Sequence, residues 1–191
     1  MATLMDRLDL AYSKLGLREA FIAAVMTRVK REVSDKVPTA GTNGTWVRYN
    51  PAFCDPLSDE ELFGLVLHES CHIVMMHMWR REGRDMRLWN VANDALINAY
   101  IKSRGWQLPK GGVHLSWVRE EHSSEYVYNK LKEQQQQQQQ SKGSGSGDGD
   151  PEDDGMGAGG FDGQCDLEDA QDDATRVDME ATIVASAKMA K

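Results

Sequence analysis

A His-Glu-x-x-His pattern occupies residues 68–72 of this 191-residue chain, inside an otherwise apolar stretch. On a helix, at about 100° per residue, His68 and His72 lie roughly 40° apart and can bind one metal ion together. Glu69 would then lie beside the ion. A zinc ion with three protein ligands keeps a fourth position for water, and a neighbouring carboxylate can accept the proton of that water. The pattern therefore indicates a zinc hydrolase with Glu69 as the general base.

The surrounding residues predict a buried helix over residues 57–80. Ser58 begins it, and Glu61, three residues later, completes a capping box. Its apolar residues are Leu62, Phe63, Leu65, Val66, Leu67, Ile73, Val74, Met75, Met76 and Met78. Two histidines and a glutamate are costly to bury in such a helix without partners, and a metal ion supplies partners. The helix therefore favours a metal site over a chance match to a short pattern.

Two other residues of this helix were considered as ligands. His77 is nine residues from His68, which places it about 180° around the helix, and we interpret it as a histidine at the surface or at the helix end. Cys71 could lie near the metal, but we interpret it as a small buried residue. Together with Cys54 and Cys165 it makes an odd number of cysteines without paired spacing, which argues against a disulfide framework or a four-cysteine zinc site.

The third ligand is predicted in the next helix, over residues 88–101. Asn90, Asp94 and Asn98 are spaced four residues apart and fall on one stripe of that helix. A carboxylate flanked by two amides suits a metal ligand that is oriented by outer hydrogen bonds. The same stripe could instead be the solvated face of an amphipathic helix. The two histidines upstream favour Asp94 as the metal ligand.

Several separated blocks agree with a known family in order and spacing: residues 42–53, 57–62, 68–72, 84–85 and 89–98. Over roughly residues 3–130 the chain resembles the VWA-associated metallopeptidase domain family of bacteria and phages, in which a zincin-like domain precedes a von Willebrand factor A-like domain. The resemblance implies an α+β fold, mainly helical, with a small β-hairpin or sheet. It also implies His68 and His72 as zinc ligands, Glu69 as the base and Asp94 as an acidic ligand, in place of the Glu of thermolysin-like gluzincins.

Two helices are expected before the motif, over residues 3–15 and 18–34, because apolar residues recur there at helical spacing. Residues 41–44 are typical of a turn, and residues 45–49 alternate as in a strand. In zincin-like folds an edge strand beside the motif helix can bind an extended peptide, which would make residues 45–49 the substrate-binding edge. An ordinary hairpin that covers the core explains the same pattern equally well.

Beyond residue 101 the sequence predicts a loop at residues 105–112 and a short helix at residues 123–131, begun by Ser123 or Ser124. A thermolysin-type mechanism also needs a side chain that stabilises the oxyanion beside the metal. The candidates are His114, His122, Tyr100 and Tyr126. The sequence selects none of them.

Composition divides the chain into a zincin-like domain at residues 1–132, a low-complexity Gln-, Gly- and Asp-rich linker at 133–175 and a terminal helix at 176–191. Residues 143–175 contain eleven acidic residues and no Lys or Arg, so they cannot bury enough apolar surface to become ordered. The formal net charge is −8, so the remaining residues carry about +3. In the resembling family the terminal helix would lead into a second domain, and its amphipathic pattern suggests docking onto another surface.

The sequence also excludes several classes of protein. It has no apolar run of the roughly 18 residues that span a bilayer and no signal-peptide pattern, so we expect a cytoplasmic protein without a membrane partner. The arginines after the motif are typical of a solvated helix end, so we expect no nucleic-acid partner. They are Arg80, Arg81, Arg84 and Arg87.

Two functions remain. The first is a metallopeptidase that cleaves peptide or protein substrates with Zn²⁺ as its cofactor. The second is a zinc-stabilised, non-catalytic module that binds a partner, for which the resemblance implies an AAA+ ATPase or a VWA-domain protein. Glu69 favours the first function, because a purely structural zinc site has no use for a base. The lack of a clear oxyanion donor favours the second.

Overall fold

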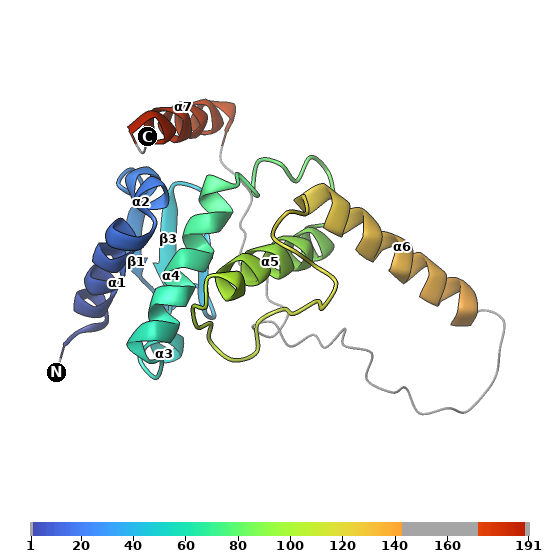
Figure 1. The fold of residues 1–191 in the computed structure, drawn as a ribbon, viewed down its shortest axis with the longest axis horizontal. Coiled ribbons are helices and arrows are strands. Elements are labelled where there is room, and N and C mark those ends of the chain that lie inside the picture. Colours follow the sequence, from blue (N-terminus) through green and yellow to red (C-terminus); the bar gives the residue numbers. More distant parts are fainter. Residues whose placement is uncertain (1, 143–171, 190–191) are drawn as a thin grey trace.

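The computed structural model describes residues 2–142 and 172–189 of the chain (Figure 1). Its helices are α1 (Leu4–Arg18), α2 (Ala20–Met26), α3 (Pro51–Cys54), α4 (Asp59–Val74), α5 (Met86–Ser103), α6 (Ser124–Lys142) and α7 (Asp173–Met189). Its strands are β1 (Lys30–Val33), β2 (Ala40–Thr42) and β3 (Trp46–Tyr49). The predicted α+β fold, mainly helical with a small sheet, is confirmed.

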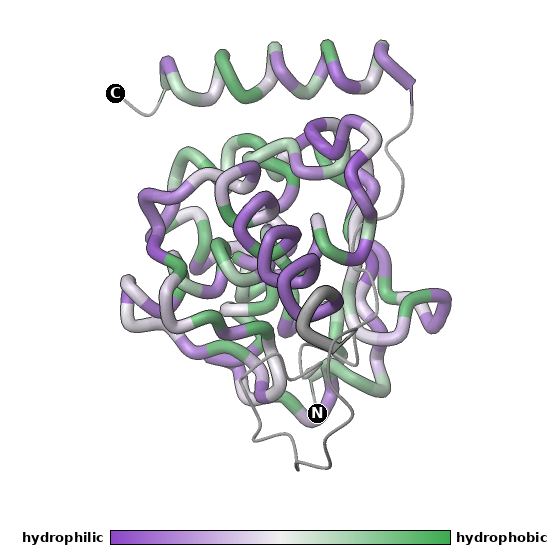
Figure 2. The backbone as a smooth tube through the Cα atoms, turned by 90° about the vertical axis from the view of Figure 1, so that its right-hand side faces the viewer, coloured by the Kyte–Doolittle hydropathy of each residue, from purple (hydrophilic) through white to green (hydrophobic). Residues whose placement is uncertain are grey.

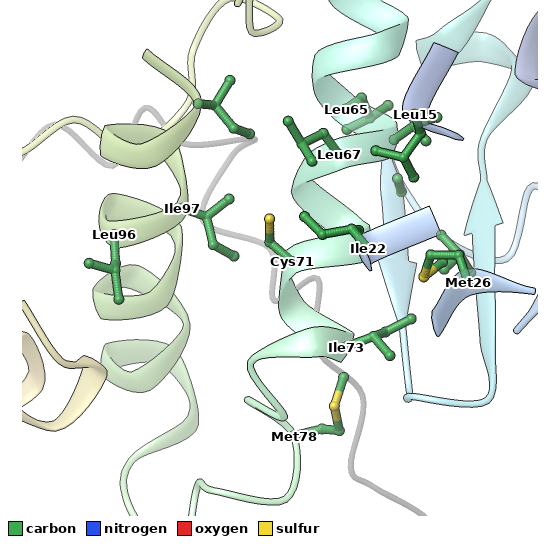
Figure 3. Packing of buried hydrophobic residues seen from close by; sticks show 14 of the residues in the cluster. Leu15, Ile22, Met26, Leu65, Leu67, Cys71, Ile73, Met78, Leu96 and Ile97 are labelled. Atoms are coloured by element: carbon green, nitrogen blue, oxygen red, sulfur yellow. The ribbon is translucent and has the colours of Figure 1, made fainter. Parts of the chain in front are cut away.

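Helix α4 lies in the middle of the fold, with α1 and α2 on one side and α5 on the other (Figure 3). Ile97 of α5 lies toward Cys71 of α4, which is buried as predicted. The other apolar residues that α4 buries are Leu62, Phe63, Leu65, Val66, Leu67 and Ile73. Burying such side chains fully contributes about 1.5–3 kcal/mol each. Packing on several sides therefore fixes the position of α4 and of the polar residues that it carries.

The start of α4 is the predicted capping box. The Ser58 hydroxyl accepts a hydrogen bond from the backbone N–H of Glu61 at 3.2 Å, and the Glu61 carboxylate accepts one from the N–H of Ser58 at 2.9 Å. Three acidic residues lie in the first turn, where the positive end of the helix dipole stabilises them. Short-range signals in the sequence thus determine where α4 begins.

The end of α4 differs from the prediction, because the helix stops at Val74 and not near residue 80. Met76 has a φ of 57°, in the left-handed region that ends many helices. Its N–H donates to the carbonyl of Ile73 at 2.9 Å, and the N–H of His77 donates to the carbonyl of His72 at 3.0 Å. These are the two bonds of a Schellman motif. The chain therefore turns back toward α4 at this point.

The predicted helix at residues 18–34 is correct only in its first part. Helix α2 ends at Met26, and β1 follows as a strand parallel to β3, with Lys30 opposite Trp46 and Val33 opposite Tyr49. Strand β1 has the sequence Lys-Arg-Glu-Val, in which only Val33 has a branched side chain of the kind that favours a strand. Pairing with β3, which is distant in sequence, makes this segment a strand and not a helix.

Strand β3 is the central strand of the sheet, which has the order β1-β3-β2, with β2 antiparallel to β3. The hypothesis that residues 45–49 form a substrate-binding edge is therefore wrong, because β3 is paired on both sides. The hairpin interpretation is correct. In its turn Gly44 has a φ of 93°, and the Asn43 side-chain oxygen accepts hydrogen bonds from the N–H groups of Thr45 and Trp46.

An ion pair between β1 and β3 predicts a small loss of stability in acid. The ammonium of Lys30 lies 2.7 Å and the guanidinium of Arg48 2.9 Å from the Glu32 carboxylate, and these contacts lower the pKa of Glu32 from 4.5 to about 2. As the pH falls from 4.5 toward about 2, Glu32 binds a proton in the unfolded chain but not in the folded chain, so the free energy of unfolding decreases. In urea titrations between pH 5 and about 3, Glu32→Gln should show a shallower decrease than wild type. Equal slopes would contradict this expectation.

Gly64 lies one turn before His68 in α4, at a point where the chain cannot accept a side chain. A Cβ atom there would lie 1.8 Å from the backbone carbonyl oxygen of Gln107, whereas at Gly16 in α1 it would meet nothing within 4 Å. Gly64→Ala should therefore destabilise the protein by about 1–3 kcal/mol, because backbone must move. Gly16→Ala is the matched control and should stabilise it by about 0.4–1 kcal/mol. Denaturant unfolding measures both, and changes of the same sign would contradict the packing described.

The helix predicted at residues 123–131 is present as the first part of α6. The Ser123 hydroxyl accepts a hydrogen bond from the N–H of Tyr126 at 3.1 Å, so Ser123 and not Ser124 caps the helix. Helix α6 continues through the glutamines to Lys142. Because Ser123 provides the cap, the hydroxyl of Ser124 is available for contacts elsewhere.

Helix α7 lies against the domain and contacts α2, and Figure 2 shows it running across one side of the fold. It begins at Asp173, slightly before the predicted residue 176. Met179 is buried and Ile183 packs against the core, which accounts for the amphipathic pattern. Among residues 2–142 and 172–189, no helix combines the length and apolar character of a bilayer span. Of the linker predicted at residues 133–175, residues 133–142 belong to α6, and residues 143–171, including Cys165, lie outside the described residues.

Candidate metal centre

Helices α4 and α5 bring His68, His72 and Asp94 together. The Nε2 atoms of the two histidines are 3.0 Å apart. The Oδ1 atom of Asp94 lies 3.5 Å from Nε2 of His68 and 3.2 Å from Nε2 of His72. Each residue thus offers one nitrogen or oxygen atom to a common point, and the group could hold a metal ion.

The three side chains are removed from water. His68 is 1% exposed, His72 0% and Asp94 6%. The Oδ1 atom of Asp94 makes no hydrogen bond. A buried carboxylate oxygen without such a partner is costly, and a cation beside the two Nε2 atoms would supply one. The donor set and the unsatisfied oxygen therefore fit a metal ion.

The amides on either side of Asp94 are also buried, so the interpretation of this stripe as a solvated face is wrong. The Nδ2 atom of Asn90 donates to Oδ2 of Asp94 at 3.1 Å. The Nδ2 atom of Asn98 donates to the carbonyl of Val113 at 2.9 Å, which leaves its Oδ1 facing Nδ1 of His68 at 3.0 Å. An amide oxygen only accepts, so Nδ1 of His68 carries the proton and Nε2 is free to bind a metal.

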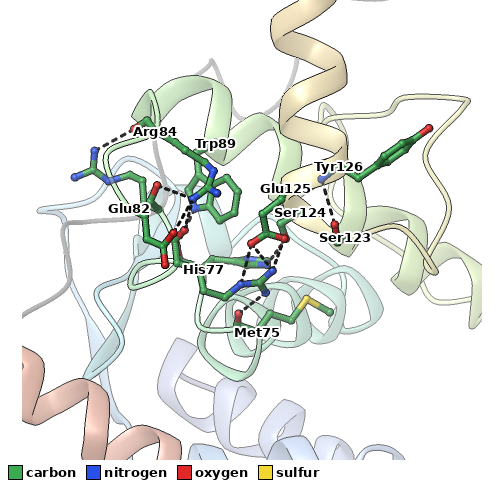
Figure 4. Close-up of polar contacts among 11 residues, drawn as sticks. Met75, His77, Glu82, Arg84, Trp89, Ser123, Ser124, Glu125 and Tyr126 are labelled. Atoms are coloured by element: carbon green, nitrogen blue, oxygen red, sulfur yellow. Dashed lines mark hydrogen bonds and ion pairs between the residues drawn. The ribbon is translucent and has the colours of Figure 1, made fainter.

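His77 is fully buried, so the interpretation of it as a surface histidine is wrong. It lies three residues after the last residue of α4, Val74, as the other interpretation, a helix-end histidine, expects. The turn at Met76 brings it back against α4, with its Nδ1 atom 3.1 Å from Nδ1 of His72. Its Nε2 atom lies 3.1 Å from the hydroxyl of Ser124, and its carbonyl accepts a hydrogen bond from the Trp89 indole at 2.8 Å (Figure 4). Burial lowers the pKa of His77 well below its usual range. It is thus a neutral neighbour of His72, and the expectation that it is not the third ligand agrees with the geometry.

Glu69, the predicted base, is 1% exposed, and its Oε2 atom has no hydrogen-bond partner. Burial raises the pKa of Glu69 well above its usual range, and the charge of Asp94 adds to the shift. A metal cation nearby would oppose that shift, because it stabilises the carboxylate. The position suits a group that takes up and releases a proton, and the role itself stays a prediction.

Two tyrosines near Glu69 were not found from the sequence. The hydroxyls of Tyr12, on α1, and Tyr49, on β3, are 2.9 Å apart. Burial raises the pKa of Tyr12 to about 12, and the nearby charge of Glu69 contributes in the same direction. Tyr49 is fully buried. Nothing in the local sequence of either tyrosine indicates this pairing, because α1 and β3 meet only in the folded domain.

The four oxyanion candidates make their contacts with other residues. The partner is Glu19 for Tyr100, Lys102 for His114, Arg119 for His122 and His122 for Tyr126. Two of these contacts lie in the loop between α5 and α6 or at the start of α6, and a third joins that loop to Lys102 of α5. The structure therefore singles out none of the four as an oxyanion donor.

A family model described as "Putative metallopeptidase domain" matches residues 3–191. The chain belongs to this family. An uncharacterized protein of Thermotoga maritima is 29% identical over 128 residues, which cover 63% of this chain and 31% of that protein. The chain thus spans less than a third of the length of that relative. No solved structure matches the chain. This member of the metallopeptidase domain family carries a His-His-Asp group that could bind a metal ion, and the VWA association stays a prediction.

Proposed function

We propose that this protein is a zinc-dependent metallopeptidase, with His68, His72 and Asp94 as zinc ligands and Glu69 as the general base. The main support is that two imidazole Nε2 atoms converge on a buried carboxylate oxygen that has no hydrogen-bond partner. The family match supports the class of enzyme. A base beside the site distinguishes it from a purely structural metal site.

The separations between the three ligand atoms support zinc as the metal. Zinc binds histidine nitrogen at about 2.0–2.1 Å and carboxylate oxygen at about 2.0–2.2 Å, so tetrahedral ligands lie about 3.3 Å apart. The separations here are 3.0, 3.2 and 3.5 Å. Three protein ligands with one open position are typical of catalytic zinc, whereas structural sites are closed by a fourth protein ligand.

Glu69 performs the proton transfers in this proposal. Zinc, when bound, lowers the pKa of water to about 7 and polarises the peptide carbonyl. Glu69 accepts the proton of the attacking water and then delivers it to the leaving amine. Its unpaired Oε2 atom is available for this task. Asn98 and Asn90 hold His68 and Asp94 in place through the hydrogen bonds described above.

The burial of the site favours the second function, a zinc-stabilised module that binds a partner without catalysis. Glu69 and both histidines are at most 1% exposed, so a peptide would reach them only after a movement of the surrounding chain. The loop between α5 and α6 is the segment that would have to move, because its Val113 carbonyl accepts a hydrogen bond from Asn98 beside His68. A binding module requires no such opening. The resemblance makes an AAA+ ATPase or a VWA-domain protein its expected partner.

Digestion of a peptide library tests the proposal. The zinc-loaded chain should cleave peptides, a chelator should abolish cleavage, and added zinc should restore it. Product termini would then give the substrate preference. If the chain binds one zinc ion and cleaves no peptide under broad conditions, the peptidase proposal fails and the binding module takes its place.

A further inference from the structure

We propose that His77 and Ser124 are positioning residues that hold the imidazole of His72 in the orientation and tautomer needed for metal binding. This inference rests on the proposed metal site and adds two residues to it. Neither was selected as functional from the sequence. Both act through His72 and touch no substrate.

The hydrogen bonds allow one arrangement of protons when His72 binds a metal. Its Nε2 atom faces Asp94 at 3.2 Å and must be free of a proton to act as a ligand, so its Nδ1 atom carries the proton. That Nδ1–H points to Nδ1 of His77 at 3.1 Å, which must therefore accept. The proton of neutral His77 then lies on Nε2 and is donated to the Ser124 hydroxyl at 3.1 Å.

Ser124 supplies the acceptor that this chain of hydrogen bonds requires at Nε2 of His77. Without an acceptor at its Nε2 atom, His77 could place its proton on Nδ1 and donate it to His72. Nδ1 of His72 would then accept, and the proton of His72 would move to Nε2, the atom that must bind the metal. A hydroxyl accepts as well as donates, so metal binding at Nε2 of His72 sets the direction, and Ser124 stabilises the resulting tautomer because it satisfies the buried N–H of His77.

Contacts on both sides hold this pair rigidly. The Trp89 indole donates to the backbone carbonyl of His77 at 2.8 Å. Next to Ser124, the Glu125 carboxylate accepts two hydrogen bonds from one guanidinium nitrogen of Arg80, at 2.7 and 2.8 Å, and a third at 3.2 Å from Nε (Figure 4). The start of α6 is thereby fixed to the turn that carries His77. Outer hydrogen bonds of this kind raise metal affinity because they orient the ligand before the metal binds.

The other histidine has an equivalent support. Nδ1 of His68 is bonded to Asn98, which in turn donates to the carbonyl of Val113. Both supports thus end in the segment between α5 and the first turn of α6, although the ligands themselves are on α4 and α5. The metal site is therefore coupled to the docking of this segment, residues 113–124.

Zinc affinities of the metal-free full-length chain, measured by competition with a chelator, test the proposal. Ser124→Ala and His77→Leu should weaken zinc binding by about 10–100-fold, the usual effect of removing an outer partner. His77→Gln should restore most of the affinity, because an amide can accept from His72 and donate to Ser124. Thr3→Ala is the matched control: it removes the cap of α1, away from the site, costs about 1 kcal/mol of stability and should leave zinc affinity unchanged.

Proton NMR of the zinc-loaded chain with ¹⁵N-labelled histidine provides a readout that general destabilisation would not change. Wild type and Thr3→Ala should show a protected proton on Nδ1 of His72, and Ser124→Ala should shift or lose it. If Ser124→Ala and His77→Leu bind zinc as tightly as Thr3→Ala, the inference is overturned while the metal site stands. If wild type binds no zinc, the proposed function fails as well. Because Ser124→Ala removes a single oxygen atom, the test does not depend on the folding of His77→Leu.

Discussion

Asp94→Ala is expected to lower the affinity of the chain for zinc by more than about 100-fold, because loss of an outer partner alone costs 10–100-fold. Asp94 supplies the one negative charge among the three proposed ligands, and its Oδ1 atom has no other partner. Asp94→Asn keeps the shape of the side chain and removes the charge, so it should also lower the zinc affinity. Titration of the metal-free chain with zinc measures both losses.

The control for this prediction is Asp35→Asn, which removes a charge from an exposed residue after β1. It should bind zinc as wild type does. Zinc at 100 times its dissociation constant should stabilise wild type and Asp35→Asn by about 2.7 kcal/mol, seen as a higher melting temperature. The Asp94 variants should show no such rise. Wild-type zinc affinity in Asp94→Ala would mean that another residue completes the site.

Glu69→Gln is expected to lower the rate of peptide hydrolysis by about 10²–10⁴-fold while zinc binding is retained. Glutamine has nearly the same size as glutamate but cannot accept the proton of the attacking water. Comparison of kcat for the zinc-loaded proteins, with Glu60→Gln at an exposed position of the same helix as control, measures the effect. Cleavage by Glu69→Gln at the wild-type rate would contradict the role of Glu69 as base.

The same substitution predicts a change in stability that requires no substrate. The pKa of Glu69 in the folded, metal-free chain lies well above its ordinary value of 4.5, because of burial and then of the charge of Asp94. As the pH rises above 4.5, the unfolded chain loses this proton more readily than the folded chain, so the wild type becomes less stable. Glu69→Gln removes that loss and should make the metal-free chain more stable than wild type at pH 7. A less stable variant would contradict the burial described.

The placement of the proposed ligands within each helix could be predicted from the sequence, because it depends on local spacing. The capping box of Ser58 and Glu61 fixes the start of α4, and the four-residue spacing of two histidines puts both on one face. The four-residue stripe on α5 likewise predicted two amides beside Asp94, of which Asn90 bonds to Asp94 and Asn98 bonds to His68 instead. In both helices, residues close in sequence are sufficient to determine which side chains share a face.

The surroundings of the proposed ligands could not be predicted, because they depend on contacts between distant segments. A straight helix would carry His77 away from His68, but the left-handed conformation of Met76 returns it to His72. Methionine is unusual at a position that favours glycine, so the sequence gives no signal of this turn. Similarly, the Ser124 contact depends on how α6 docks, and β1 becomes a strand only through pairing with β3.

An anomalous difference map at the zinc absorption edge, from a crystal of the zinc-loaded chain, tests the central claim most directly. The account predicts one strong peak within about 2.0–2.2 Å of Nε2 of His68, Nε2 of His72 and Oδ1 of Asp94. A crystal of zinc-loaded Asp94→Ala should lack the peak. A wild-type map with no peak between these three atoms, or with zinc bound by other residues, would contradict the account.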